Sequence, residues 1–147
     1  MLTVVLTLIS CNRKTVYNHF EHTAIDGWGW EQTDTLHYKV TGIGKGGVFA
    51  EEIGLRSISS YPFTELVLIV RQRAVPSGYS RNDTLRISIT DKKGHFLGDG
   101  LSYHQLRKEL PDITLQDDDS LYVSINHFMK RNNLKGIGDV GFKLIRK

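Results

Sequence analysis

The stretch Thr84-Leu85-Arg86-Ile87-Ser88-Ile89-Thr90 alternates strictly between polar and apolar side chains. A period of two places the apolar side chains on one face of a β-strand and the polar side chains on the other. The same alternation recurs over residues 36–41, 121–126 and 140–144. These runs predict an antiparallel arrangement of strands, each with one face on a core and the other in water.

One fully apolar run and the spacing of the turns extend this prediction to the whole domain. Leu66-Val67-Leu68-Ile69-Val70 is apolar at every position, which indicates a central strand or one covered on both faces. Turn-forming residues separate the strand-like runs, at 42–47, 76–78, 91–94, 117–119 and 136–138. Many strands with no long amphipathic helix predict an all-β fold, an antiparallel, jelly-roll-like β-sandwich.

Two segments need separate interpretations. Residues 42–47 are rich in glycine but lack the Lys-Ser/Thr pair of a phosphate-binding loop, so we predict a flexible hairpin there. Residues 103–110 carry Leu106 and Leu110 at helical spacing and end at Pro111. This pattern predicts a short helix, at most one in the fold, or an irregular crossover between the sheets.

The composition of the 147 residues excludes several classes of protein. The hydrophobic fraction of 39% and the charged fraction of 24% exclude a disordered chain. A net charge of +3, from 19 basic and 16 acidic side chains, is too small and too dispersed to indicate a nucleic-acid partner. The single cysteine excludes an internal disulfide and a cysteine-rich zinc site. Cys11 is therefore a buried residue, a reactive group or an attachment point.

The residues before Cys11 indicate an attachment point. Met1 to Ser10 form an uncharged, largely apolar run, about half the ~20 residues that a membrane-spanning helix needs. The run fits the apolar region of a signal peptide, and Leu8-Ile9-Ser10-Cys11 looks like a bacterial lipobox. In such proteins the cysteine thiol is diacylated and the chain is cut before it. No basic residue precedes the run, and a buried first strand through Val4-Val5-Leu6 is the alternative interpretation.

The lipobox divides the chain into three parts. We expect a signal-peptide remnant at 1–10, an acylated cysteine with a short polar tether at 11–14, and a single β-sandwich domain at 15–147. Two acyl chains hold a protein firmly on a membrane, whereas one alone is marginal. The predicted membrane attachment is thus a covalent lipid of the palmitate type on Cys11.

Two aromatic clusters are the candidate binding residues. Glycines flank Trp28 and Trp30, while Tyr61 and Phe63 flank Pro62. Aromatic rings in such positions form either a sugar-stacking platform or a plug at the end of the sandwich core. The plug is the favoured interpretation, and we keep the four aromatic residues as candidate binding residues.

The polar clusters do not indicate catalysis or metal binding. His19-Phe20-Glu21-His22 offers too few convergent ligands for zinc, which normally takes three or four. Asp117-Asp118-Asp119 lacks the alternating acids and the later Glu of a calcium loop, and is typical of a solvated turn. There is no Gly-x-Ser-x-Gly elbow. We therefore predict no catalytic residue, no metal and no cofactor beyond the lipid on Cys11.

Short motifs in a fixed order give the chain a resemblance to a known family. They are Val16-Tyr17, Gly27-Trp28, Tyr61-Pro62-Phe63 leading into residues 66–70, Asp83-Thr84-Leu85, a glycine-rich run over 94–100, and Gly136-Ile137-Gly138-Asp139-Val140-Gly141-Phe142. Together with the lipobox cysteine, this order resembles the GldH family of gliding-motility lipoproteins from Bacteroidetes, over essentially the whole mature chain.

The resemblance implies an outer-membrane lipoprotein connected with the gliding apparatus and type IX secretion, with no established enzymatic activity. The basic tether Asn12-Arg13-Lys14 contrasts with the acidic cluster of surface-exposed lipoproteins, so we expect the protein to face the periplasm. The leading hypothesis is a non-catalytic assembly or stabilising subunit whose partners are other envelope proteins. The alternatives are a carbohydrate-binding module that uses Trp28, Trp30 and Tyr61 on envelope glycan or peptidoglycan, and a hydrolase.

Overall fold

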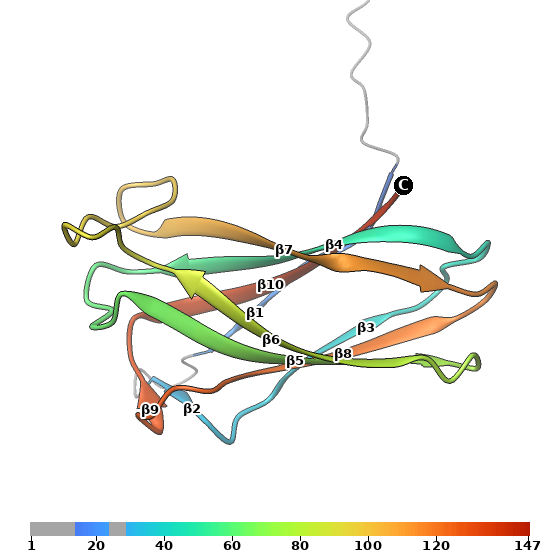
Figure 1. Cartoon of the computed structure of the whole chain (residues 1–147), viewed down its shortest axis with the longest axis horizontal. Coiled ribbons are helices and arrows are strands. Elements are labelled where there is room, and N and C mark those ends of the chain that lie inside the picture. The colour runs from blue at the N-terminus through green and yellow to red at the C-terminus, as the bar shows by residue number, and fades with distance from the viewer. Residues whose placement is uncertain (1–13, 24–28) are drawn as a thin grey trace, which may run out of the picture.

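A computed structural model describes residues 14–23 and 29–147 of the chain, and Figure 1 shows the strands stacked in two layers. No helix occurs in these ranges. The ten strands are β1 (Thr15–His22), β2 (Trp30–Glu31), β3 (Leu36–Val40), β4 (Gly47–Ser57), β5 (Glu65–Val75), β6 (Ser80–Ser88), β7 (His104–Leu115), β8 (Ser120–His127), β9 (Asn133–Leu134) and β10 (Ile137–Arg146).

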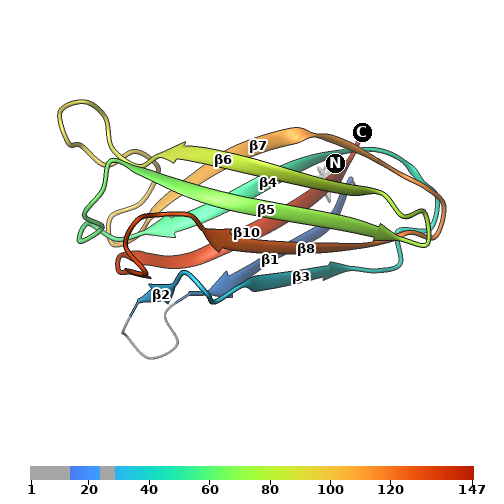
Figure 2. The same cartoon turned by 60° about the horizontal axis from the view of Figure 1, so that its bottom comes forward.

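The strands form two four-stranded sheets and one small pair. The first sheet has the order β1-β10-β4-β7 and is called the β4 sheet below; the second has the order β3-β8-β5-β6 and is called the β5 sheet. Figure 2 brings the β5 sheet forward, and β2 pairs with β9 at one end of the sandwich. Every pairing is antiparallel, so the predicted antiparallel β-sandwich is confirmed.

The core lies between the two layers and is built by the alternating positions that the sequence predicted. Leu85, Ile87 and Ile89 are buried, while Arg86 and Ser88 between them are exposed. The apolar run at residues 66–70 lies in β5, which pairs with β6 on one side and β8 on the other. The prediction of a central strand there is confirmed.

The prediction of a helix within residues 103–110 is wrong, because residues 104–110 are part of β7. Leu106 and Leu110 are four residues apart, an even spacing that a strand also places on one face. This segment is a strand because β7 pairs with β4 over almost its whole length. Pro111 cannot donate to a neighbouring strand, and it lies where the register of the pairing shifts.

The glycine-rich segment 42–47 is not a hairpin. It connects β3 with β4, which belong to different sheets, so it carries the chain from one layer to the other. Gly42 and Gly44 have φ angles of 69° and 67°, a conformation that glycine adopts without strain. The Gly46 N–H donates to the Asp117 carboxylate at 2.7 Å, which fastens this crossover to the neighbouring β7–β8 turn.

The three aspartates of that turn differ in their surroundings. Asp117 and Asp118 are exposed, as predicted for a solvated turn. Asp119 is only 1% exposed, because its carboxylate accepts hydrogen bonds from the backbone N–H groups of Ser77 and Gln116. The solvated-turn prediction is therefore wrong for Asp119, which ties the β5–β6 hairpin to the β7–β8 turn.

Among residues 14–23 and 29–147, none belongs to a helix with the length and apolar character to span a bilayer.

Candidate functional site

The predicted aromatic residues lie mainly in the core. Trp30 is fully buried, its indole N–H donates to the Asp34 carbonyl at 2.9 Å, and its ring meets the His127 ring edge-on at 5.1 Å. Burial lowers the pKa of His127, which favours the neutral imidazole beside that indole. Trp30 is thus a core plug, and its ring has no free face for a sugar.

The second aromatic cluster is also closed. Tyr61 is 4% exposed and donates from its hydroxyl to the Glu65 carbonyl at 2.8 Å. Phe63 is half-buried and meets the Tyr61 ring edge-on at 5.8 Å. The alternative of a stacking platform does not hold for Trp30 and Tyr61, because both rings are inside the sandwich, as the favoured core-plug interpretation predicts. Trp28 and Cys11 lie outside the described residues.

The two histidines of β1 each lie beside one carboxylate. His19 Nε2 lies 2.9 Å from the Glu21 carboxylate, and His22 contacts the Asp139 carboxylate. Within the described parts of the chain, no three metal-ligating side chains converge. The strand geometry separates the two imidazoles, since residues three apart on a strand point to opposite faces.

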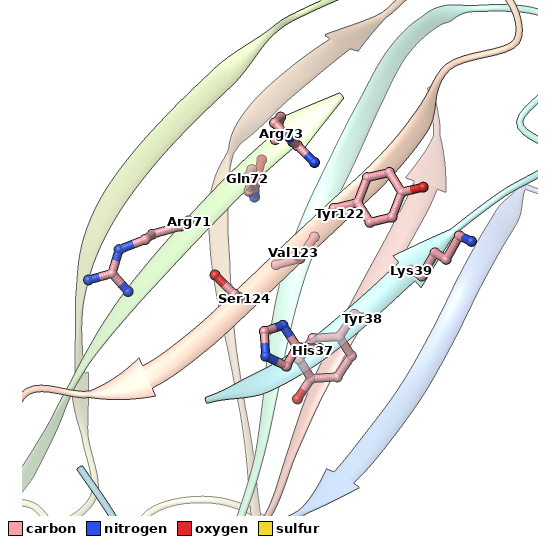
Figure 3. Close-up of a pocket in the computed structure, with 9 residues that line it drawn as sticks. All are labelled: His37, Tyr38, Lys39, Arg71, Gln72, Arg73, Tyr122, Val123 and Ser124. Carbon is pink, nitrogen blue, oxygen red and sulfur yellow. The ribbon is translucent and has the colours of Figure 1, made fainter. Parts of the chain in front are cut away.

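A different surface presents an unusual arrangement of side chains, on the outer face of the β5 sheet. An open groove of about 520 Å³ lies across β3, β8 and β5 (Figure 3). Apart from the buried residues Tyr38, Gln72 and Val123, its lining is His37, Lys39, Arg71, Arg73, Tyr122 and Ser124. We call this surface the basic groove.

Strand register arranges these side chains in two rows. Lys39 is opposite Tyr122, which is opposite Arg73. One side-chain repeat further along the strands, His37 is opposite Ser124, which is opposite Arg71. Neighbouring strands lie about 4.8 Å apart, so the β3 and β5 side chains form two walls roughly 10 Å apart, with β8 as the floor.

The cations of the groove surround one aromatic ring. Lys39 Nζ lies 5.6 Å from the centre of the Tyr122 ring, and the Arg73 guanidinium lies 5.8 Å from it. The Arg71 guanidinium donates to the Asn126 side-chain oxygen at 2.6 Å. Within the described ranges, no carboxylate forms an ion pair with Lys39, Arg71 or Arg73.

The outer face of the β4 sheet is arranged differently. Arg56 lies 3.7 Å from the Asp139 carboxylate, and its guanidinium covers the Phe20 ring at 4.0 Å. The Phe20 ring rests on two glycines, Gly54 and Gly141, where an added Cβ would lie only 2.7 and 2.8 Å from the ring. Arg56 and Phe20 therefore both have partners within this face.

A charged cluster inside the sandwich joins the two layers. Glu51 of β4 points into the core and is 1% exposed, and its carboxylate accepts a hydrogen bond from Arg81 of β6. Arg81 also donates to Asp83 at 2.6 Å and to the Pro111 carbonyl of β7 at 3.1 Å. Burial raises the pKa of Glu51 to about 7, although the Arg81 guanidinium acts in the opposite direction.

The sequence contains part of the signal for the basic groove. Arg71-Gln72-Arg73 continues the β5 strand with cations at alternate positions, so two cations on one face are predictable from the period alone. Their meeting with Lys39 and Tyr122 depends on which strands are neighbours and in which register. Neither property can be read from the sequence, so the sequence alone does not predict the groove.

Comparisons with known proteins place the chain among lipoproteins. The family model described as GldH lipoprotein matches residues 15–144. The chain is 24% identical over 154 aligned positions to the gliding motility lipoprotein GldH of Flavobacterium johnsoniae, covering 100% of this chain and 94% of that protein.

Solved structures show weaker likenesses. Eiger TNF from S. frugiperda has 8% identity and a TM-score of 0.35, with 92% of this chain and 95% of that chain covered. Dimeric latent PorU from Porphyromonas gingivalis has 11% identity and a TM-score of 0.40, with 91% of this chain and 13% of that chain covered.

Proposed function

The chain belongs to the GldH family of gliding motility lipoproteins, and from this premise we propose that it is a lipid-anchored, non-catalytic subunit of the gliding and type IX secretion machinery. In this role the β-sandwich holds a partner protein of the envelope on the basic groove. The protein lies on the periplasmic side of the outer membrane, and the lipid on Cys11 keeps it there.

The observation that carries the binding role is the unneutralised charge of the groove. Lys39 and Arg73 flank Tyr122, and Arg71 lies one repeat away on the same wall as Arg73. Like charges that gather on one surface repel each other, and an anionic partner would relieve that repulsion. Cations and a tyrosine provide recognition, whereas covalent catalysis needs an activated nucleophile and a base to assist it.

The position of the first described residue supports the anchoring role. The Arg146 N–H donates to the Lys14 carbonyl at 2.7 Å, so the chain enters the sandwich beside the end of β10. Three residue steps separate Cys11 from Lys14, a reach of roughly 10 Å when extended. A lipid on Cys11 would therefore hold this end of the sandwich close to the membrane surface.

Charge reversal in the source organism tests the proposed function. We expect cells that carry Arg71→Glu/Arg73→Glu as the sole copy to lose colony spreading, because a negative wall would repel the partner. The membrane-fraction level of the protein should be unchanged. Arg86→Glu is the matched control, because Arg86 lies on the same sheet face outside the groove and already pairs with Glu65 at 2.8 Å. Normal spreading of the double variant would refute the docking role.

A second variant tests the anchor separately. Cys11→Ala should deplete the protein from the outer-membrane fraction, because the thiol that carries the lipid is gone. If the variant stays in the outer-membrane fraction after a high-salt wash, the lipid anchor on Cys11 is refuted.

A further inference from the structure

We propose that the basic groove binds an extended acidic polypeptide segment that lies along β8 with carboxylates on alternate residues. The proposal rests on the proposed function, because it specifies the chemistry of the partner at the same surface. It is carried by the width, the repeat and the preorganisation of the groove.

The groove has the dimensions of a trough for one extended chain. Ser124 has a small side chain and forms the floor between His37 on one wall and Arg71 on the other (Figure 3). The walls are two strand spacings apart, roughly 10 Å, which leaves room for a single backbone with its side chains turned to either side, above Ser124 in one row and across the Tyr122 ring in the next. A chain that lies there would point successive side chains alternately at the two walls.

The spacing of the arginines matches the repeat of such a chain. Arg71 and Arg73 are separated by one residue on β5, so their Cα atoms lie about 7 Å apart along the strand. Side chains i and i+2 of an extended peptide have the same separation. Carboxylates at i and i+2 would therefore face both guanidinium groups, and residue i+1 would face the wall that carries Lys39.

The arginines are also positioned in advance. Asn126 of β8 holds the Arg71 guanidinium at 2.6 Å, and Tyr122 lies beside Arg73. A guanidinium that is already oriented loses less conformational entropy when it binds, and its planar donors match both oxygens of a carboxylate. These features favour a carboxylate-bearing segment that meets the two arginines in register.

The geometry favours a polypeptide over the other anionic partners of an envelope. A sugar ring stacks on an open aromatic face, but Lys39 and Arg73 approach the Tyr122 ring at 5.6 and 5.8 Å. A membrane would meet the end of the sandwich near Lys14, and β1, which begins there, belongs to the opposite layer from the groove. A narrow trough on that other layer suits a chain rather than a flat lipid surface.

Two synthetic peptides of identical composition test the proposal with the full chain. Both are nine-residue, Ser/Thr-rich, end-capped peptides with two glutamates, placed at positions 4 and 6 in the first and at positions 2 and 8 in the second. We expect the first to bind about tenfold more tightly, a difference of roughly 1.4 kcal/mol, because both carboxylates reach the arginine pair. The preference should shrink as salt is raised.

Variants assign the preference to the groove. Arg71→Gln/Arg73→Gln should abolish the preference, whereas Arg86→Gln should keep it. Ser124→Glu provides an independent test, because an acid on the floor of the trough should block the first peptide without removing an arginine. Unchanged far-ultraviolet circular dichroism and melting temperature establish that the variants fold.

Two further titrations test whether the groove binds another class of anionic ligand. Polygalacturonate and vesicles with anionic lipid are titrated against the same variants. Equal binding of the two peptides, or tighter groove-dependent binding of polygalacturonate or vesicles, would overturn the proposal. If the peptide preference is absent while charge reversal still stops spreading, the inference fails and the proposed function stands. If the preference is present while spreading is normal, the proposed function fails.

Discussion

The two outer faces of the sandwich differ in whether their cations have partners within the chain. On the β4 sheet, Arg56 has both a carboxylate and an aromatic ring as partners, and that ring, Phe20, is seated on two glycines. On the β5 sheet, Lys39, Arg71 and Arg73 have no carboxylate partner within the described residues. Arg56 and Phe20 thus have their partners within the chain. The three cations of the second face do not, and under the proposed function another molecule would supply the anions.

The largest expected effect concerns the cluster that joins the two layers. Arg81→Met removes the cation from the buried Glu51 carboxylate, and we expect a loss of about 3 kcal/mol in the free energy of unfolding, measured by urea denaturation at a pH roughly two units above the Glu51 pKa of about 7, where the carboxylate is ionised. Glu51→Met/Arg81→Met should recover much of that loss, since no uncompensated charge stays buried. A double variant no more stable than the single variant would show that the pair does not couple the layers.

The next effect is a pH dependence of the same cluster. The folded-state pKa of Glu51, about 7, lies above its ordinary value of 4.5, so the folded chain binds more protons between these values. The contribution of Glu51 to the free energy of unfolding should therefore be largest below pH 4.5 and decrease as pH rises through 7. We expect the contribution of Glu51 to change by about 1–2 kcal/mol between pH 5 and 7.

Glu51→Gln is the control for this pH dependence, because it keeps the size of the side chain and removes the titrating group. Its stability should show a shallower fall over the same interval, while His127 contributes equally to both proteins. Parallel curves for the two proteins would assign the pH dependence to other groups.

A smaller effect concerns the outer face of the β4 sheet. Phe20→Ala removes the ring that covers Gly54 and Gly141, and we expect the protein to lose about 1–2 kcal/mol of stability. Binding of the acidic peptide should be unchanged, because Phe20 lies on the opposite layer from the groove. Thermal denaturation and peptide titration of the same preparation measure both effects. A weakened peptide affinity would mean that the two faces are coupled.

The smallest effect is expected when Arg71 of the groove is given a carboxylate partner within the chain. Asn82 is the cross-strand neighbour of Arg71 on β6, so Asn82→Glu would give that cation a partner within the chain. We expect a gain of about 0.5 kcal/mol in stability and a severalfold weaker affinity for the acidic peptide. Urea denaturation and titration with the peptide check the two parts. Stability and affinity that rise together would contradict the view that internal and external anions compete for Arg71.

Much of the fold could be predicted because the period of two is a local property. Leu85, Ile87 and Ile89 occupy the core face that their alternation indicated. The failures have physical causes of a different kind. The spacing of Leu106 and Leu110 suits a helix and a strand equally, and the pairing of β7 with β4 decides between them.

The candidate site depends even more on non-local structure. Arg71 and Arg73 share a face by local alternation, but Lys39 is more than thirty residues earlier and Tyr122 about fifty residues later. Only strand order and register bring them into one row. Trp30 is a different case: its flanking glycine left a platform and a core plug open, with the plug favoured, and the hydrogen bond to Asp34 and the contact with His127 fix it in the core.

The pairing of β1 with β10 has a mechanical consequence for a chain held at its first strand. β1 runs antiparallel to β10 along almost its whole length, and Lys14 lies where β10 ends. A pull on Lys14 along the strand axis would load the backbone hydrogen bonds of this pair in shear, so that they resist together. A sideways pull would open them one after another, like a zipper. The direction of tension, rather than the number of bonds, thus sets how much force the first strand withstands.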